Sequence, residues 1–429
     1  MWNKEAPRRG AIQIPKQKGG DKKKKMKTKT TILVGIAICT ILLTSPALAS
    51  AGYSKIYGNA NEDDVLDMRD VTYIKLVIFG KKPATTFADA NYDGKISMLD
   101  VGQTKLIILG KEKKLTLVDM ADRTVTVPRP IERIVSPSLD GVRTVVQLGA
   151  ADKIVGVPDR LVCENVRLPA VVRPELTELP AVGWREINVE LIASLKPDVI
   201  FGSSTYADAL QENTGIPVVC LWTQGSLDFR IYRLVGTVIG KEKRAEELIL
   251  YASEELDKVT EVTSQIPEDE KPRVYMELYR NFITPIRYDP IELAGGINVA
   301  KDCAGVYSVQ ISKEQIIAWN PDIIMLQRMW TKPGNPYPKV QVEGILSDPD
   351  YQTLYAVKNR KVYHTIGHSA GWDPATGVVE TFYMAKLFHP DKFRDLDMEK
   401  EGNEILERFY GAEGLYTAMA EGRRLHRWE

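Results

Sequence analysis

The spacing of hydrophobic positions changes along the chain, and these changes divide it into segments. Residues 32–43 form a continuous apolar run behind a lysine-rich stretch. Segments 71–82 and 101–112 carry apolar residues at helical spacing, and each has a glycine where a helix would end. From residue 114 onward, short apolar runs alternate with helix-like segments, which is typical of βαβ units. The pattern predicts a leader, a small helical domain and a large α/β region.

The α/β region contains an internal repeat. The stretch "VELIASLKPDVI" (189–200) aligns with "KEQIIAWNPDII" (313–324), so each half has a helix, an X-Pro-Asp turn and a buried strand. A long segment without proline or glycine, 241–266, separates the halves and ends before Pro267. We therefore predict two Rossmann-like lobes, at 115–235 and 268–429, joined by one linking helix at 236–267. The tail from residue 389 reads as amphipathic helices that pack on the second lobe.

The N-terminal segment has the marks of a secretory signal peptide. A basic stretch precedes the apolar run, and small residues follow at 47–49, so residues 1–49 are predicted to be removed. Met26 is a second candidate start that would give a leader of ordinary length. An uncleaved N-terminal anchor is the alternative, but the run is short for a membrane span. Cys39 lies inside the run without a small residue before it, so no lipoprotein site is expected.

Charge and cysteine content narrow the function classes. Residues 1–49 hold 11 Lys and Arg against 2 Asp and Glu, whereas the remainder holds 46 against 55. A mildly acidic exported protein is not a nucleic-acid binder by charge. Cys163, Cys220 and Cys303 remain after leader removal, so at most one internal disulfide can form. Three small buried residues are the simpler expectation.

Two acidic loops repeat with a period of 30 residues. "ADANYDGKISMLD" (88–100) places oxygen side chains at loop positions one, three, five and twelve, with Gly94 at position six, as in a calcium loop. "NANEDDVLDMRD" (59–70) is its twin. The expected ligands are Asn59, Asn61, Asp63, Asp67 and Asp70 in the first loop, and Asp89, Asn91, Asp93 and Asp100 in the second. Each loop precedes a helix, so two Ca²⁺ ions are predicted. The alternative is a pair of acidic solvated turns.

The duplicated loop–helix unit resembles a dockerin domain, over residues 54–113. Its second loop lacks the entering helix of an EF-hand, and position twelve is Asp in both loops. The resemblance implies that calcium folds the domain and that its helices bind a cohesin module on another protein. Positions ten and eleven often help to choose the cohesin, and here they are Met68 and Arg69, then Met98 and Leu99. An apolar contact with the partner is expected.

The region 115–395 resembles the substrate-binding proteins of iron-siderophore and vitamin B12 ABC importers. "LTLVDMADRTVTVPRPIERIVS" looks like the opening of this family, with Asp122 where a glycine usually stands, and "LKPDVIFGS" is its most recognisable stretch. The resemblance implies capture of an iron-siderophore or corrinoid chelate and delivery to a membrane permease with its ATPase. It also implies that Glu190 and Glu314, which lie at equivalent positions of the repeat, dock on the permease. Two ordinary solvated glutamates are the alternative.

Ligand contacts are expected in loops that follow the strands, because α/β sheets bind ligands at the carboxyl ends of their strands. Aromatic side chains suit a corrinoid, haem or catecholate, and arginines suit an anionic group. The candidates are Ser136, Ser138, Trp184, Arg185, Tyr206, Trp222, Tyr279, Arg280, Tyr307, Arg328, Trp330, His368 and Trp372. Arg287 and Tyr288 fit the site and the surface equally well. Direct metal ligation by His368 and Asp373 with a tyrosine is a minor option.

Catalytic motifs are missing from the sequence, so no enzyme activity is expected. The chain is predicted to act outside the cell membrane, with a permease, its ATPase and a cohesin-bearing surface protein as partners and no nucleic acid. Three alternatives remain open: binding of an oxyanion such as molybdate or tungstate, a scaffold role without a ligand, and a metal-dependent enzyme of the same fold. The last needs a metal cluster, whereas His364, His368, His389 and His426 are scattered.

Overall fold

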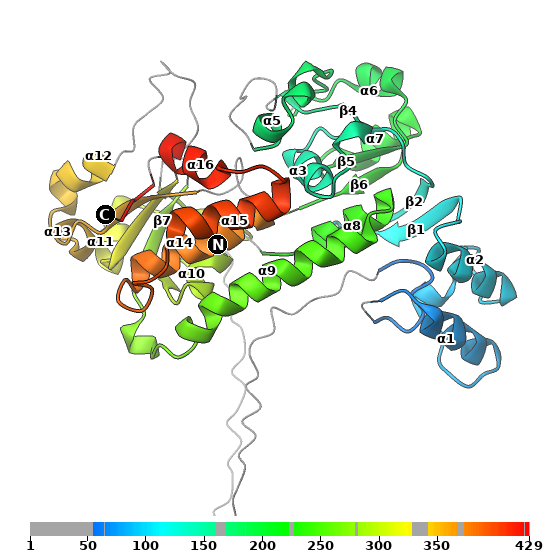
Figure 1. The fold of residues 1–429 in the computed structure, drawn as a ribbon, viewed down its shortest axis with the longest axis horizontal. Coiled ribbons are helices and arrows are strands. Elements are labelled where there is room, and N and C mark those ends of the chain that lie inside the picture. Colours follow the sequence, from blue (N-terminus) through cyan, green and yellow to red (C-terminus); the bar gives the residue numbers. More distant parts are fainter. Residues whose placement is uncertain are drawn as a thin grey trace, which may run out of the picture. The chain divides into compact units, whose positions relative to one another are not determined.

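The computed structural model describes residues 55–63, 65–159, 161, 168–184, 186–222, 227–278, 282–327, 342–366, 373–423 and 425–428. The predicted leader, Asp64 and Cys163 lie outside these residues. Among the described residues, no helix combines the length and the apolar character needed to cross a membrane. Figure 1 shows the arrangement of the elements.

Residues 55–112, which we call the repeat module, contain two helices whose bounds differ by 30 residues. They are α1 (Met68–Ile78) and α2 (Met98–Ile108). Each begins with a capping box, and each ends at a glycine with φ of +67° at Gly80 and +61° at Gly110. Val71, Ile74 and Val101 are buried in a small core of the module's own. The period-30 pattern therefore predicted both helices.

The repeat module is joined to the first lobe by a strand pairing. The hairpin of β1 (Lys114–Val118) and β2 (Thr124–Pro128) opens the lobe. Ile56 pairs with Leu117, and the backbone N–H of Tyr57 donates to the Thr116 carbonyl at 3.0 Å. Ile56 is buried in the same hydrophobic core as the lobe. The start of the module is therefore held against this hairpin by a short β-bridge.

Both lobes contain a four-stranded parallel sheet with the same strand order. The first sheet has the order β4-β3-β5-β6, and the second has the order β9-β7-β11-β12. In each sheet, the strand that comes second along the chain lies at one edge. The strands that come first, third and fourth along the chain lie beside it in that order. The strands are β3 (Ile134–Val135), β4 (Ile154–Gly156), β5 (Val199–Gly202), β6 (Val218–Cys220), β7 (Arg273–Glu277), β9 (Ile297–Asn298), β11 (Ile323–Gln327) and β12 (Val362–Thr365).

Helices and one β-ribbon surround these sheets. The first lobe has α3 (Leu139–Gln147), α5 (Leu168–Val172), α6 (Val189–Leu195) and α7 (Ala207–Thr214). The second has α10 (Asp289–Leu293), α11 (Lys313–Trp319), α12 (Val342–Ser347) and α13 (Tyr355–Lys358), together with the antiparallel ribbon of β8 (Ile283–Pro285) and β10 (Ser308–Gln310). The ribbon was not predicted from the sequence.

The X-Pro-Asp turns of the internal repeat have one geometry. Helices α6 and α11 end at left-handed residues, Lys196 with φ +47° and Asn320 with φ +44°. The Asp198 carboxylate then accepts the backbone N–H of Arg133 at 2.8 Å, and Asp322 accepts that of Arg273 at 2.8 Å. Each aspartate thus ties the strand that follows it to the neighbouring strand, which explains why the same residue types recur.

The predicted linking helix is shorter than expected. Helix α8 (Arg230–Ile239) ends at Gly240, which is left-handed, and the linking helix is α9 (Glu242–Thr263). Residues 236–239 therefore belong to α8, and the boundaries 236–267 were too wide. Buried residues of α8 and α9 belong to one hydrophobic core that includes residues of both lobes.

The C-terminal tail packs on the second lobe, as predicted, and also contacts the first lobe. Helices α14 (Pro374–Phe388), α15 (Met398–Tyr410) and α16 (Leu415–Arg423) follow the second sheet, and α15 contacts both α14 and the first-lobe helices α3 and α5 (Figure 1). The expected packing of the tail on the second lobe is therefore confirmed by the α14–α15 contact, whereas its contact with the first lobe was not predicted. The apolar face of α15 is shared between the two lobes, with Phe409 in their common core.

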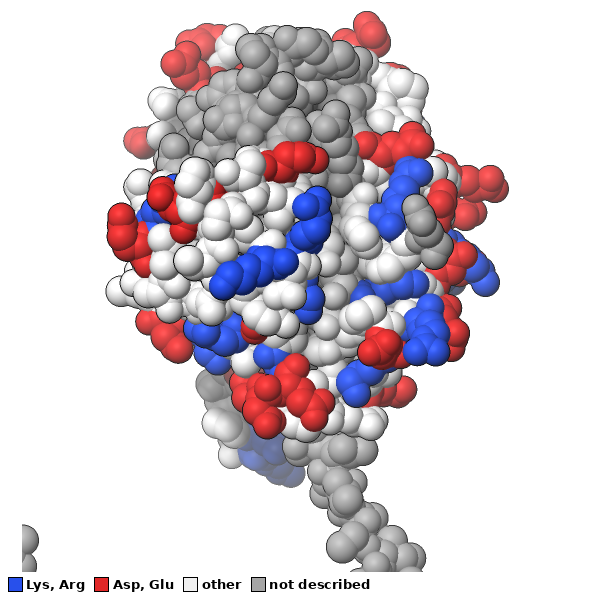
Figure 2. All heavy atoms as spheres, turned by 90° about the vertical axis from the view of Figure 1, so that its left-hand side faces the viewer, with Lys and Arg blue, Asp and Glu red and all other residues white. Residues whose placement is uncertain are grey.

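Charged side chains of both signs are mixed on the face of the second lobe that carries α11, α12 and α13. Figure 2 shows lysines and arginines interspersed with acidic residues on this face. Lys313, for example, forms ion pairs with Asp348 at 2.9 Å and Asp350 at 2.5 Å. Such alternation gives no one-sign patch on the described part of this face.

Candidate ligand-binding site

The strand order places the candidate site in each lobe. In a parallel sheet of this order, the chain direction of the crossovers reverses between the first and third strands, and ligands bind outside the carboxyl ends there. These strands are β3 and β5 in the first lobe, and β7 and β11 in the second. The loops that follow β3 and β5 begin at Ser136 and Ser203.

The hydroxyl of Ser136 is already hydrogen-bonded within the protein. Its side chain is fully buried, and its hydroxyl lies 2.7 Å from the Ser138 carbonyl and 2.9 Å from the Phe201 carbonyl. A hydroxyl hydrogen shared between two carbonyls holds the loop after β3 against β5. The predicted contact of Ser136 with a ligand therefore finds no support in its geometry.

Ser138 and Tyr206 lie half-buried at the starts of two helices. The Ser138 hydroxyl accepts the backbone N–H of Asp140 at 3.2 Å and caps α3. Tyr206 directly precedes α7, and its ring packs against the backbone of Gly202, where an added Cβ would lie 2.9 Å from Cε2. Burial raises the pKa of Tyr206 to about 12, so its hydroxyl stays protonated as a donor.

Trp222 and Tyr307 bring the two lobes into contact. Trp222 follows β6 of the first lobe, and Tyr307 precedes β10 of the second-lobe ribbon. Their ring centroids are 4.8 Å apart at an interplanar angle of 44°, and Tyr307 keeps 50% of its surface exposed. Two predicted ligand residues from different lobes therefore share one aromatic surface.

A second contact between the lobes was missed by sequence reasoning. The backbone N–H of Leu227, between β6 and α8, donates to the Asp289 carboxylate at 2.9 Å, and Arg287 pairs with the same carboxylate at 3.0 Å. Tyr288, by contrast, is fully buried with its hydroxyl on Glu380. Tyr288 is thus a core residue, whereas Arg287 is exposed. The Arg-x-Asp spacing at the start of α10 is compatible with the Arg287–Asp289 pair but does not indicate the contact with Leu227.

Several predicted contacts lie outside the described residues. They are Arg185, Tyr279, Arg280, Arg328, Trp330, His368 and Trp372. Trp184 is described and is half-buried. The described part of the candidate site is therefore Ser138, Trp184, Tyr206, Trp222 and Tyr307.

Glu190 and Glu314 occupy equivalent positions in the two lobes. Each lies in the first turn of its helix, α6 or α11, and each is exposed. Hydrogen bonds from its own backbone and from Ser312 lower the pKa of Glu314. Both side chains are therefore available to a partner as charged groups, as the predicted docking role requires.

The described residues of the two predicted calcium loops share several equivalent hydrogen bonds. The carboxylates at position twelve, Asp70 and Asp100, are fully buried and accept the backbone N–H of Asn61 and Asn91, both at 3.1 Å. Burial raises the pKa of Asp70. The position-five carboxylates, Asp63 and Asp93, accept the position-seven N–H, both at 2.9 Å. Carboxylate and amide oxygens are the donor set that Ca²⁺ prefers, so the residues fit this ion.

The loops differ at their charged ends. Arg69 forms ion pairs with Asp63 at 3.1 Å and Asp67 at 3.0 Å in the first loop. The second loop has Leu99 in the place of Arg69. Among the described residues, no group of three or more His, Cys, Asp or Glu side chains converges as a metal site. Any calcium ligation therefore depends on the asparagines and on backbone carbonyls as well. The described residues therefore also lack the metal cluster that the metal-dependent enzyme alternative needs.

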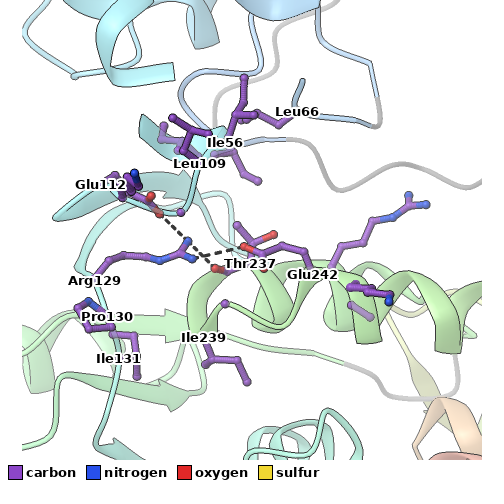
Figure 3. A pocket seen from close by; sticks show the side chains of 18 of the residues that line it. Ile56, Leu66, Leu109, Glu112, Arg129, Pro130, Ile131, Thr237, Ile239 and Glu242 are labelled. Atoms are coloured by element: carbon purple, nitrogen blue, oxygen red, sulfur yellow. Dashed lines mark hydrogen bonds and ion pairs between the residues drawn. The ribbon is translucent and has the colours of Figure 1, made fainter. Parts of the chain in front are cut away.

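One pocket lies where the repeat module meets the first lobe. It has a volume of about 1230 Å³ and is lined by Ile56, Leu66 and Leu109 of the module and by Ile131 and Ile239 of the lobe (Figure 3). Glu112 is buried beside it and pairs with Arg129 at 2.8 Å, while Arg129 donates to the Thr237 carbonyl at 2.8 Å. The residues that line the pocket do not come from the loops after β3 and β5, so the pocket is distinct from the predicted ligand site.

Two lobes of one topology, joined by a single long helix, define a two-lobed binding protein. The profile of the family described as periplasmic binding protein matches residues 134–367, more than half of the chain. The chain therefore belongs to the periplasmic binding protein family. It is the substrate-binding component of an ABC importer, a class that works with a separate permease and ATPase and is not enzymatic.

Two curated relatives bind different ligands. The molybdate-binding protein MolA of Haemophilus influenzae is 26% identical over 326 residues, covering 68% of this chain and 90% of MolA. A solved structure of MolA with molybdate has a TM-score of 0.57 at 25% identity, covering 70% of this chain and 98% of that one. A cobalamin-binding protein of Halobacterium salinarum is 25% identical over 222 residues, covering 49% of this chain and 58% of the relative.

Proposed function

We propose that the protein captures a metal chelate with an aromatic or macrocyclic ring system, an iron(III)-siderophore or a corrinoid, outside the membrane. The observation that carries this proposal is the Trp222–Tyr307 pair, because it brings a partly buried ring of the first lobe against a half-exposed ring of the second. Flat aromatic faces bind conjugated rings over a large area and at a low cost in side-chain entropy. The cobalamin-binding relative supports a corrinoid.

A second candidate ligand is an oxyanion such as molybdate or tungstate. The similarity to MolA over most of both chains favours it. An oxyanion needs hydroxyl and N–H donors in a small space. Ser138 and the hydroxyl-rich loop of Ser203 and Thr205, whose hydroxyls lie 3.1 Å apart, supply such groups at the strand ends. The hydroxyl of Ser136 is already used within the fold.

Native mass spectrometry with absorbance spectroscopy separates these candidates. The exported chain is mixed in turn with a ferric catecholate, cyanocobalamin and sodium molybdate. A coloured one-to-one adduct with the first or second probe is the expected result and names the ligand class. A colourless molybdate adduct would move the proposal to oxyanion uptake. No adduct with any probe would contradict ligand capture and favour a scaffold role.

The repeat module gives the protein a proposed point of attachment. In this proposal the module is a dockerin-like domain that binds two Ca²⁺ ions and a cohesin-bearing surface protein. The duplicated loop geometry supports the first part. The apolar side chains of Met68, Met98 and Leu99, which are more than half exposed, support the second. The module would then hold the protein at the extracellular face of the membrane.

Delivery of the ligand is assigned to the two lobes together. Glu190 and Glu314 would each contact an arginine of the permease, so that a protein with two similar lobes sits on a permease with two-fold symmetry. The equivalent positions and exposure of the two glutamates support this role. ATP hydrolysis would belong to the partner ATPase.

A further inference from the structure

Helix α15 forms a second bridge between the lobes, alongside the linking helix α9. The guanidinium of Arg244, on α9, donates to the carbonyl of Arg408 at 2.6 Å. The ring of Phe409 lies 5.9 Å from that of Tyr232 on α8, and the Tyr232 hydroxyl donates to Gln147 of α3 at 2.8 Å. The C-terminal end of α15 is therefore anchored to first-lobe elements as well as to α14.

A buried charged cluster lies at this second bridge. Asp373 precedes α14 and keeps 3% of its surface exposed, and Arg143 of α3 keeps 2%. One Asp373 carboxylate oxygen, Oδ2, accepts the Tyr410 hydroxyl at 2.5 Å and lies 3.8 Å from Nε of Arg143. The other oxygen accepts the backbone N–H of Thr376 at 2.9 Å and caps α14. A single carboxylate thus joins α3, α14 and α15.

We propose that the Arg143–Asp373–Tyr410 cluster is a positioning device that sets the separation of the two lobes at the ligand site. Arg143 lies on α3, which begins directly after Ser138, at the carboxyl end of β3. Asp373 fixes the start of α14 in the second lobe. The cluster therefore holds a site-bearing helix of one lobe at a set distance from the other lobe.

The buried charges of the cluster favour one separation of the lobes over slightly larger or smaller ones. Charged groups removed from water interact strongly and tolerate little displacement, because a separated buried ion loses its partner without regaining solvent. Arg143 has a second carboxylate, Asp140, at 3.6 Å within its own helix, whereas its ion pair with Asp373 crosses between the lobes. Tyr410 holds the Asp373 carboxylate toward Arg143 from the α15 side.

The test measures lobe separation directly. Spin labels are placed at Glu212→Cys on α7 and Lys358→Cys on α13, both exposed, with Cys39, Cys163 and Cys303 replaced by serine. Tyr410→Phe removes one hydroxyl from the cluster, and Asp373→Asn removes its negative charge. Tyr383→Phe is the matched control, because this buried hydroxyl donates to the His364 carbonyl at 2.9 Å within the second lobe.

We expect Tyr410→Phe and Asp373→Asn to broaden the inter-label distance distribution, whereas Tyr383→Phe leaves it unchanged. An unchanged distribution in a folded Tyr410→Phe protein would overturn the inference. The expected effect on ligand binding rests on the proposed function. Cyanocobalamin, a ferric catecholate and molybdate are first tested on the parent chain. For the probe that binds, Tyr410→Phe and Asp373→Asn should weaken binding by about two- to thirtyfold. If no probe binds the parent chain, the proposed function fails while the distance measurement still decides the cluster's role.

Discussion

The indole ring of Trp222 and the phenol ring of Tyr307 lie 4.8 Å apart between their centroids, although they belong to different lobes and are separated by 84 residues of sequence. Trp222 follows the last strand of the first sheet, and Tyr307 is carried by the β8–β10 ribbon of the second lobe. A ligand held between the lobes at this point must either stack on this pair or part its rings. Both outcomes change the surroundings of the indole.

Replacing either ring should therefore weaken the binding of a ring-bearing chelate. An aromatic pair contributes about 0.5–1.5 kcal/mol beyond its buried area, so Trp222→Ala or Tyr307→Ala should raise Kd by about two- to tenfold or more. Titration of cyanocobalamin or a ferric catecholate, followed by absorbance, measures the change. Trp319→Phe is the control, because this ring packs on Tyr275 within the second lobe. If Trp222→Ala and Tyr307→Ala had the same Kd as the parent chain and the control, the two rings would not contact the ligand.

The sequence predicted the architecture wherever a period or a repeat was strong. The 30-residue period placed α1 and α2, and the aligned Pro-Asp turns placed α6 with β5 and α11 with β11. Helix α14 was not recognised, because every residue from Pro374 to Phe388 is buried and no polar face marks a helical period. The shared packing of α15 was missed because a hydrophobic stripe predicts burial but not which lobe provides it.

The candidate site was predicted less completely than the fold. The carboxyl-end rule selected Trp222 and Tyr307 separately, because it ranks loops by their place after a strand. It gave no sign that these rings meet, since that depends on the β8–β10 ribbon. It also selected Ser136, whose hydroxyl is consumed by two backbone carbonyls. Asp373 and Arg143 pair across 230 residues, and no local pattern indicates such a contact.

Glu190 and Glu314, at equivalent positions in the two lobes, lead to a prediction about transport rather than ligand affinity. Glu190→Ala with Glu314→Ala should leave Kd for the ligand unchanged, because both side chains are exposed on helices α6 and α11. Loss of two charge pairs should lower the apparent affinity for the permease by about tenfold or more, measured as stimulation of the reconstituted importer's ATPase. Glu212→Ala, an exposed glutamate on α7, is the control. Undiminished stimulation by the double variant would place permease docking elsewhere on the protein.

Calcium should stabilise the protein through the repeat module. Asp70 and Asp100 are buried carboxylates, and a bound cation would offset the cost of burying their charge. At Ca²⁺ concentrations a hundredfold above Kd, each site should add about 2.7 kcal/mol to the free energy of unfolding. Thermal unfolding with calcium and with a chelator measures this difference. Identical Tm values under both conditions would contradict the calcium proposal.

The two predicted calcium loops should differ in their affinity for calcium. Arg69 already pairs with Asp63 and Asp67, so calcium must displace its guanidinium from the first loop. The second loop has Leu99 at the matching position and should bind more tightly. Asp100→Asn should then remove the tighter site in calorimetric titration, and Asp70→Asn the weaker one. Arg69→Ala should raise the affinity of the first loop, and an unchanged affinity would show that the ion pair does not compete.

Cys220 and Cys303 should differ sharply in their reactivity toward alkylating reagents. Cys220 and Cys303 are both free thiols in the described residues. Burial, reinforced by Asp119, raises the pKa of Cys220 to about 12, so almost none of it is thiolate at pH 8, and its side chain is buried at the end of β6. Cys303 is half-buried and should be alkylated by iodoacetamide in the native protein, while Cys220 should react only after unfolding. Peptide mapping by mass spectrometry, before and after denaturant, measures both; rapid native labelling of Cys220 would show that the end of β6 opens to solvent.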